Sequence, residues 1–217
     1  MRPRHYDDPR QNAQMAVAMN PQEQFWAWFE QHQDDLFNFK VDQERTFDEL
    51  SRALNRFHKY LTFEFGPEVN GRREFVISAS GIKKAFPAVT ALTAAAPKFD
   101  RWEIVAFRPR RTAICAVDLG GTRLAPEEVE FVLLSNGKMA GIRLFIPGFT
   151  EDNLALKQIA YLMLDEALGE YDVETKLGLI QLTTVGDCGG VERHPLPELP
   201  ARFDELLKQI EPYGSPN

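Results

Sequence analysis

The feature of this sequence that most constrains its fold is a strand-turn-strand-helix pattern that occurs twice. The dipeptide Asn-Gly, which favours tight hairpin turns because both residues tolerate a positive φ, stands at residues 70–71 and again at 136–137. Behind each turn, apolar residues alternate along the chain until they reach a glycine. Four positions match at a constant offset of 67 residues, namely Phe75, Ile77, Ala79 and Gly81 with Ile142, Leu144, Ile146 and Gly148.

The two copies predict a tandem β-β-α-β unit over residues 61–109 and 126–186. In each copy an apolar helical stretch follows the glycine, and a third strand is expected after it. Because tight hairpins pair antiparallel neighbours, we expect a mainly antiparallel sheet. Residues 112–117, between the copies, also read as a strand. The match indicates an internal repeat.

Two amphipathic helices are predicted before the first copy and a short helix, residues 201–210, after the second. Thr46 and Glu49 have the spacing of a capping box at the start of the second helix. These elements predict the α+β class, with a flexible leader at residues 1–20 and a single domain over 21–217. Helical spacing is shown by Phe25, Trp28, Phe29, Leu36 and Phe37, and then by Phe47, Leu50, Leu54, Phe57 and Leu61.

Aromatic residues are concentrated near the start of the chain. Of the 24 aromatic residues, 11 lie between Phe25 and Phe65. Their spacing favours the packing of two helices on a sheet through large side chains. The alternative is a stacking platform for bases or sugars.

Composition and charge exclude several classes of function. The chain has 217 residues and a net charge of -7, which argues against nucleic acid as a partner, since phosphate backbones need a broad basic surface. Cys115 and Cys188 exclude a disulfide scaffold and are too few for a structural zinc site. No apolar run reaches the roughly 20 residues of a membrane span. We therefore expect a cytoplasmic protein without a membrane partner, metal or cofactor.

A cluster of arginines is the first candidate site. Arg108, Arg110 and Arg111 follow the strand that begins at Trp102, and guanidinium groups bind phosphate or carboxylate in a bidentate way. The alternatives are a solubilising edge, or arginines that pair with the acidic residues of a stretch further along the chain. The acidic stretch at residues 151–175, which includes Glu170 and Asp172, could supply those residues or could itself meet a basic partner.

A cysteine near a histidine is the second candidate. Cys188 lies among glycines, with His194 six residues further along the chain. A thiol close to an imidazole is the arrangement of a cysteine nucleophile. No sequence signature of a known cysteine enzyme surrounds Cys188.

Several stretches of the sequence resemble a family of uncharacterised bacterial proteins. The resemblance covers most of the chain after Asn20 and implies no established activity, cofactor or catalytic residue. It is carried by Phe25-Trp26-Ala27-Trp28-Phe29, Phe63-Glu64-Phe65-Gly66, Ile77-Ser78-Ala79-Ser80-Gly81-Ile82, Ala95-Ala96-Pro97, Arg101-Trp102 and Ala106-Phe107-Arg108-Pro109-Arg110.

These observations predict a non-enzymatic module that binds a protein or a small anionic ligand. The binding face would contain Trp102 and the three arginines, or Glu170 and Asp172. The alternative is a small hydrolase or transferase with a site assembled from Cys188, His194 and the arginines.

Overall fold

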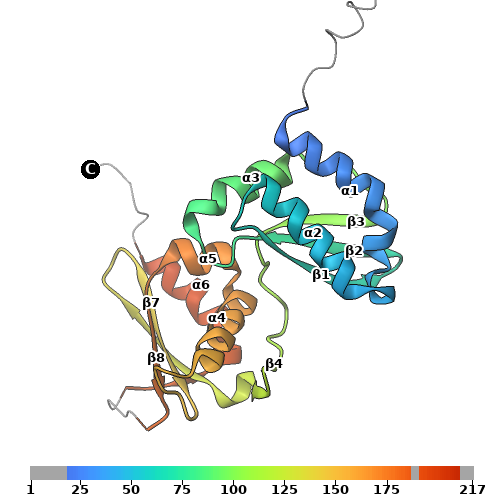
Figure 1. The fold of residues 1–217 in the computed structure, drawn as a ribbon. Helices are drawn as coiled ribbons and strands as arrows, with labels where there is room; N and C mark the ends of the chain where they lie inside the picture. The colour runs from blue at the N-terminus through green and yellow to red at the C-terminus, as the bar shows by residue number, and fades with distance from the viewer. Residues whose placement is uncertain (1–18, 187–190, 211–217) are drawn as a thin grey trace, which may run out of the picture.

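Two hydrophobic cores organise the structure, which is a computed structural model that describes residues 19–186 and 191–210. Each core belongs to one half of the chain, and the halves lie side by side (Figure 1). Residues 107–116 form the linker between the halves. The predicted leader lies almost entirely outside the described residues, and the single domain over 21–217 stays a prediction.

The first half consists of helices followed by a small sheet. Its elements are α1 (Pro21–Phe37), η1 (Phe39–Val41), α2 (Gln43–Phe57), β1 (Thr62–Val69), β2 (Arg72–Ser78), η2 (Lys83–Ala85), α3 (Phe86–Ala94) and β3 (Trp102–Ala106).

The second half begins with a short hairpin and ends with a helix. Its elements are β4 (Val117–Leu119), β5 (Thr122–Leu124), η3 (Pro126–Glu128), β6 (Glu130–Ser135), β7 (Ala140–Ile146), α4 (Leu154–Leu168), α5 (Glu170–Lys176), β8 (Leu177–Thr184), β9 (His194–Pro195), η4 (Leu196–Glu198) and α6 (Leu199–Gln209).

The two halves share one topology. In the first, β1 pairs antiparallel with β2, and β2 pairs parallel with β3 across α3. In the second, β6 pairs antiparallel with β7, and β7 pairs parallel with β8 across α4 and α5. The predicted α+β class is confirmed, and the β-β-α-β order occurs twice. A common origin of the two copies stays a prediction.

The strands are divided among three sheets, although the sequence pattern led us to expect one. The sheets have the orders β1-β2-β3, β4-β5 and β8-β7-β6-β9. In each copy, the crossover helix returns the third strand to the side of the second and covers one face. Each copy therefore completes a sheet and a core of its own.

Local signals were confirmed at some turns and wrong at others. Asn70 and Gly71 have φ values of 52° and 76° and form the expected tight turn. At the second Asn-Gly, the connection from β6 to β7 is longer and consists of residues 136–139, where the side chain of Asn136 accepts hydrogen bonds from the N–H groups of Lys138 and Met139. The strand predicted at residues 112–117 is wrong except for Val117, where β4 begins.

The start of α2 also differs from its prediction. The helix begins at Gln43, and Asp42 is its N-cap, with a side chain that accepts a hydrogen bond from the N–H of Arg45. Thr46 lies inside the helix and is buried, so the predicted capping box is wrong. Thr46 has the right residue type and spacing for a cap, but its side chain is 4% exposed and the helix has already begun three residues earlier.

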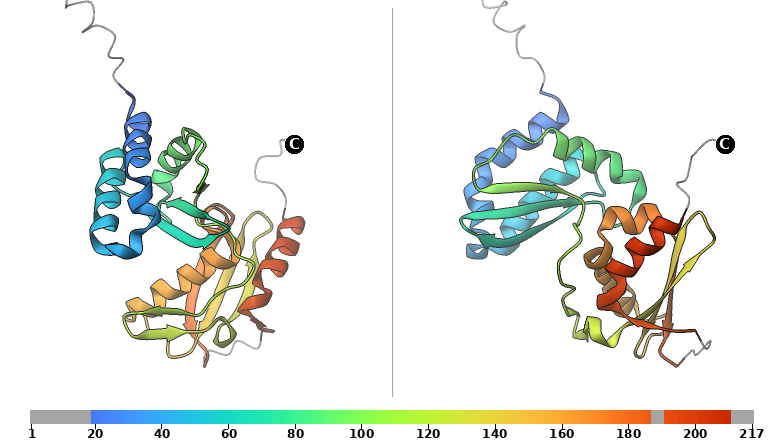
Figure 2. Two further views of the ribbon diagram at one scale, coloured as in Figure 1. Left: turned by 90° about the vertical axis from the view of Figure 1, so that its right-hand side faces the viewer. Right: turned by 180° about the vertical axis from the view of Figure 1, so that it is seen from behind.

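Helices cover one face of each main sheet (Figure 2). In the first half the core is aromatic, with the rings of Phe29 and Phe75 stacked at 5.0 Å and Trp102 nearly fully buried. In the second half α4 and α6 share the core with β7. Within the described ranges, no helix combines the length and the apolar character needed to cross a membrane.

The N-cap of α2 generates the first testable prediction. Asp42→Ala should lower the free energy of unfolding by about 1 kcal/mol, because the first-turn N–H groups lose their acceptor. Asp48→Ala is the matched control, since Asp48 lies within the same helix and only pairs with Arg52 on the surface. It should cost less than about 0.5 kcal/mol in urea unfolding. Equal effects of the two substitutions would contradict the assignment of the cap.

Candidate functional site

A buried carboxylate joins the two halves. Glu170, the first residue of α5, is fully buried. Its Oε1 accepts hydrogen bonds from the N–H groups of Ala79 and Gly81, both at 3.1 Å, and its Oε2 accepts one from the N–H of Arg108 at 3.1 Å. The N–H of Glu170 in turn donates to the carbonyl of Arg108 at 2.9 Å. We call the region around this carboxylate the junction.

The backbone conformation next to Glu170 allows this close approach. Gly169 has a φ of 84°, and a Cβ atom at this position would lie 3.2 Å from the backbone nitrogen of Arg110. A side chain here would therefore be strained by its φ and crowded by the linker. On the other side, Ala79 and Gly81 follow the end of β2 and Arg108 follows the end of β3. Two neighbouring strand ends thus supply the donors.

The three arginines predicted as a binding cluster form ion pairs within the chain. Arg108 pairs with Glu64 of β1 and, at 3.3 Å, with Asp165 of α4. The other two arginines pair with Asp204 at 2.8 Å (Arg110) and with Glu74 at 2.7 Å (Arg111).

The remaining candidates of the predicted binding face also have contacts within the chain. Trp102 is in the aromatic core, Glu170 holds the junction, and Asp172 pairs with Lys176 at 2.8 Å. Arg108 pairs with the acidic stretch at residues 151–175, through Asp165, whereas Arg110 and Arg111 pair with acidic residues outside that stretch. A partner-binding role for these residues stays a prediction.

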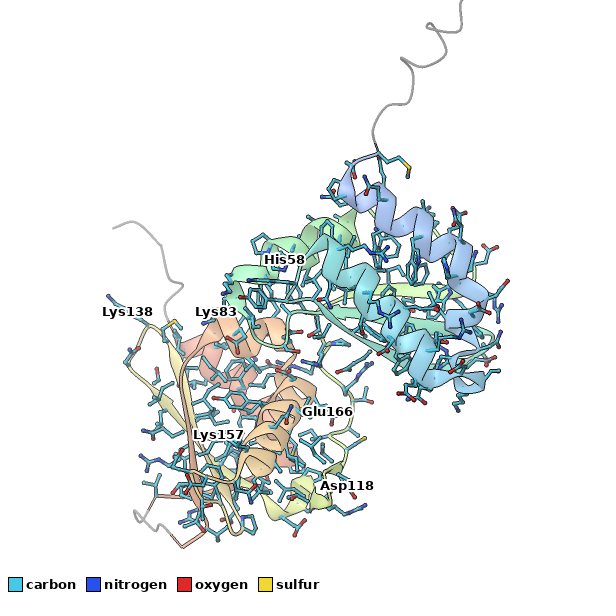
Figure 3. All side chains as sticks on the ribbon, in the orientation of Figure 1. His58, Lys83, Asp118, Lys138, Lys157 and Glu166 are labelled. Atoms are coloured by element: carbon cyan, nitrogen blue, oxygen red, sulfur yellow. The ribbon has the colours of Figure 1, made fainter. Side chains whose placement is uncertain are left out.

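A hollow lies at the junction. It has a volume of about 430 Å³ and is lined by Ser80, Gly81, Arg108, Gln158, Tyr161, Leu162, Asp165 and Glu174. Lys83 pairs loosely with Glu174, at 3.8 Å, and lies close to α5 (Figure 3). We call this space the junction hollow.

Burial perturbs the acidic groups of the junction hollow. Loss of solvent raises the pKa of Asp165 to about 7, opposed by the charge of Arg108 and reinforced by that of Glu170. Burial also raises the pKa of Glu174. The carboxyl group of Asp165 therefore changes its protonation state near neutral pH.

Ser80 is the residue of the junction hollow that most resembles a nucleophile. It is exposed, has a φ of 46° and stands between a strand and a helix. Acyl transfer at such a serine needs free N–H donors for the oxyanion. The nearest candidates, the N–H groups of Ala79 and Gly81, already donate to Glu170. The local geometry therefore gives no support to an acyl-transfer site at Ser80.

The proposed cysteine site is not assembled by the described residues. Cys188 lies outside them. His194 is in β9, where its ring lies 5.8 Å from that of Phe131. The ion pairs of Arg108, Arg110 and Arg111 involve Glu64, Asp165, Asp204 and Glu74 instead.

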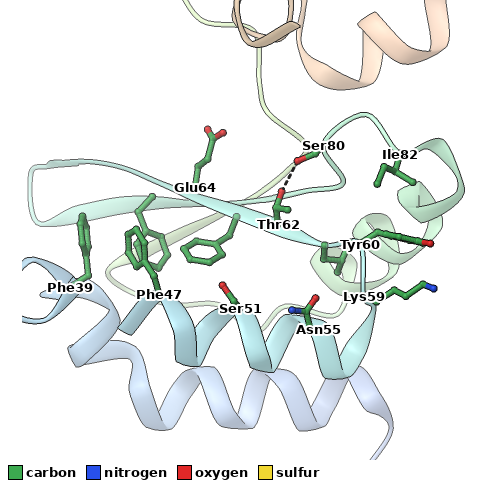
Figure 4. A pocket seen from close by; sticks show the side chains of 13 residues that line it. Phe39, Phe47, Ser51, Asn55, Lys59, Tyr60, Thr62, Glu64, Ser80 and Ile82 are labelled. Carbon is green, nitrogen blue, oxygen red and sulfur yellow. Dashed lines mark hydrogen bonds between the residues drawn. The ribbon is translucent and has the colours of Figure 1, made fainter. Parts of the chain in front are cut away.

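A hollow of about 800 Å³ lies between α2 and β1 (Figure 4). Four partly exposed phenylalanines, which come from η1, α2 and β1, give it an apolar wall. The ring centroids are 5.1 Å apart for Phe39 and Phe47 and also for Phe47 and Phe63. We call it the aromatic hollow; it is lined by Phe39, Phe47, Ser51, Asn55, Lys59, Tyr60, Leu61, Thr62, Phe63, Glu64, Phe65, Ser80 and Ile82.

One end of the aromatic hollow is cationic. Figure 4 shows Phe39 and Phe47 at one end and Tyr60 with Lys59 at the other. Lys59 and Lys84 lie over the ring of Tyr60, at 4.8 and 4.3 Å from its centroid. The Nζ of Lys84 donates to the hydroxyl of Tyr60 at 3.2 Å, and this bond, together with the charge of Lys59, lowers the pKa of Tyr60.

Neither lysine forms an ion pair with a carboxylate in the described part of the chain. The carboxylate of Glu64, which also borders the hollow, points away from the phenylalanine rings (Figure 4) and pairs with Arg108. The positive charge of Lys59 and Lys84 is thus left for solvent or a ligand.

Sequence reasoning noted these aromatic residues and assigned them to the core. That assignment is correct for Phe25 and Phe29 and incomplete for Phe39, Phe63 and Phe65, whose rings remain partly exposed. The available signal in the sequence was the large number of aromatic residues, because they occur in η1, in α2 and in β1.

Comparisons of the chain with protein-family models, curated proteins and solved structures gave no match. A function therefore has to be inferred from the geometry of the two hollows and the junction.

The junction generates the second prediction. Glu170→Gln should lower the free energy of unfolding by about 2 kcal/mol, because an amide offers one acceptor oxygen and turns its own N–H₂ toward a buried donor. Asp172→Asn, two residues away in the same helix, removes one charge of a partly exposed ion pair with Lys176 and should cost less than about 1 kcal/mol. Urea unfolding of the two variants measures the difference. If Glu170→Gln left the free energy of unfolding unchanged, the three N–H bonds would not hold the junction.

Asp165 generates the third prediction. Its pKa is higher in the folded state than the ordinary value near 4, so the folded state binds the extra proton between about pH 4 and 7. Stability from this group is present below pH 4 and is lost as the pH rises to 7, by up to about 1.4 kcal/mol per pH unit. Asp165→Asn should remove this loss, as measured by urea unfolding at pH 5, 6, 7 and 8. An unchanged pH dependence in the variant, compared with Asp172→Asn, would contradict the assignment.

Proposed function

We propose that the protein is a non-enzymatic binding module whose aromatic hollow receives a ligand with an apolar body and an anionic group. The observation that carries the proposal is the conjunction of partly exposed phenylalanine rings with two lysines that have no carboxylate partner among the described residues. Apolar walls with a few polar groups at one end are typical of ligand sites.

The apolar part of the ligand is inferred from the rings. Exposed aromatic surface costs free energy, about 25 cal/mol for each Å² that remains in contact with water. Phe39, Phe47 and Phe63 would lose much of this exposure under a bound apolar group. Their mutual contacts hold the wall in place before binding, so little ordering would be needed.

The anionic part is inferred from the charges. The whole chain carries -7, yet Lys59 and Lys84 meet at Tyr60 without a carboxylate partner among the described residues. A local positive potential in an acidic protein directs anions to one place on the surface. The aromatic ring beneath the lysines restricts their motion and thus favours a fixed position for the anion.

Catalysis is the weaker alternative. Within the described residues, neither serine that lines the aromatic hollow hydrogen-bonds to a histidine, a lysine or a carboxylate, and at Ser80 the neighbouring N–H donors serve Glu170. A catalytic role for Cys188 and His194 is not tested by the described residues, because Cys188 lies outside them. The aromatic hollow therefore carries the proposal.

Three expectations from the sequence enter the proposal unchanged. We place the protein in the cytoplasm, where the free thiol of exposed Cys115 suits a reducing compartment. We assign the chain to the bacterial family that it resembles. We also attribute its two β-β-α-β units to an internal duplication.

Binding of 8-anilinonaphthalene-1-sulfonate, an aromatic probe with an anionic group, tests the proposal. The folded protein should bind it with a rise in fluorescence. Ser51→Trp, which fills the aromatic hollow from α2, should weaken binding at least about tenfold, a loss of about 1.4 kcal/mol. Asp48→Trp, on an exposed position of the same helix, is the matched control and should bind normally.

The charge requirement is tested with a double variant. Lys59→Gln with Lys84→Gln should weaken binding of the probe several-fold, because the site loses two positive charges. Lys98→Gln with Lys138→Gln makes the same change in net charge at exposed lysines away from the hollow. Equal binding by Ser51→Trp and the unchanged protein would refute the proposed site.

A further inference from the structure

The strand that forms one wall of the aromatic hollow is also the edge of a sheet. β1 pairs with β2 on one side, and within residues 19–186 and 191–210 no strand pairs with its other side. Residues 61–65, which include the first part of β1, line the aromatic hollow. An open strand edge presents N–H and C=O groups that can pair with an added strand.

The register shows which backbone groups point outward. The carbonyl of Ile77 in β2 accepts a hydrogen bond from the N–H of Phe107 at 2.8 Å, on the β3 side. In an antiparallel ladder the N–H and C=O groups of one residue point to the same side. Phe63, the register partner of Ile77, is therefore in a non-hydrogen-bonded pair and directs its N–H and C=O away from β2. Phe65, two residues further on, does the same.

The usable edge is short. The ladder between β1 and β2 is irregular between Phe65 and Glu68, and Pro67 in this interval has no N–H to donate. An added strand can thus form regular hydrogen bonds with Phe63 and Phe65, over about five residues. Side chains of the added strand opposite these two residues would lie on their face of the sheet, which is the face of the aromatic hollow.

We propose that the occupant of the aromatic hollow is the carboxyl-terminal segment of another protein, added as a strand antiparallel to β1. This inference rests on the proposed function and names the ligand of the same site. In an antiparallel arrangement, the end of the added segment lies beside the start of β1, next to Tyr60. Its terminal carboxylate then meets Lys59 and Lys84, and alternate apolar side chains enter the aromatic hollow.

Charge complementarity selects this orientation and this kind of partner. A parallel strand would place its carboxylate at the far end of β1, near Glu68 and away from the two lysines. Internal segments of a protein would bring no carboxylate of their own main chain. Main-chain hydrogen bonds provide affinity in strand addition, while alternate side chains and a terminal carboxylate provide selectivity.

Titration of synthetic peptides into the full chain tests the inference. The probe is an acetylated hexapeptide with the order serine, leucine, serine, leucine, serine, valine. Its binding is measured by calorimetry. Methylation of a backbone nitrogen at either leucine nearest the valine should weaken binding at least about tenfold, because that N–H would bond to β1. Methylation at the serine between these two leucines should change binding less than about threefold. A profile without this alternation would overturn strand addition.

The carboxylate contact is tested by a double-mutant cycle. The peptide acid should bind more tightly than the peptide amide, and the ratio should fall to near one in the variant with Lys59→Gln and Lys84→Gln. The ratio should persist with Lys98→Gln and Lys138→Gln. A ratio that does not depend on Lys59 and Lys84 would overturn the assigned orientation.

The outcomes separate the inference from the proposed function. If the anilinonaphthalene probe binds and is blocked by Ser51→Trp while the peptide acid fails to bind, the aromatic hollow is a ligand site and the peptide inference is wrong. If neither binds, both are wrong. Sedimentation of the unliganded chain as a dimer that dissociates with Ser51→Trp would assign the β1 edge to a second copy and likewise overturn the inference.

Discussion

The carboxylate of Glu170 is the interaction on which the arrangement of the two halves depends. A buried carboxylate must be compensated by donors, and here three backbone N–H groups from two strand ends of the first half serve this purpose. The bonds hold the turn after β2, the start of the linker and α5 in one place. Arg108 is consequently held between Glu64 and Asp165. An arginine that the sequence suggests as part of a binding site is thus paired with carboxylates of the same chain.

This arrangement leaves the first half with one open side. Its helices cover one face of the sheet, and on the other face Glu64 and Glu74 pair with arginines of the linker. β3 and the linker continue into the junction, whereas β1 remains an edge. Beside that edge the aromatic residues exceed what the core can enclose, so part of their surface faces the aromatic hollow. The aromatic residues of the first half thus form its core and also line the proposed ligand site.

Much of the local structure could be read from the residues. The Asn70-Gly71 turn, the alternation that ends at Gly81 and the first-turn proline of α1 depend on backbone preferences and short-range periodicity, and all three are present. The errors have a common cause. Thr46 could have capped α2, but it is buried inside the helix, which begins at Gln43 with Asp42 as its N-cap. Residues 112–116 alternate like a strand, yet Glu166 binds the N–H of Cys115 and no strand forms there.

By itself, the sequence determined most of the longer helices and strands, the repeated β-β-α-β pattern and the aromatic character of the first core, because each follows from residues close together in the chain. Only the tertiary structure decided which charges neutralise one another and which surface stays open. The pairs of Arg108 with Asp165 and of Arg110 with Asp204 join residues 57 and 94 positions apart. Their proximity arises from the contact between two separately formed sheets and their helices, for which local periodicity carries no information.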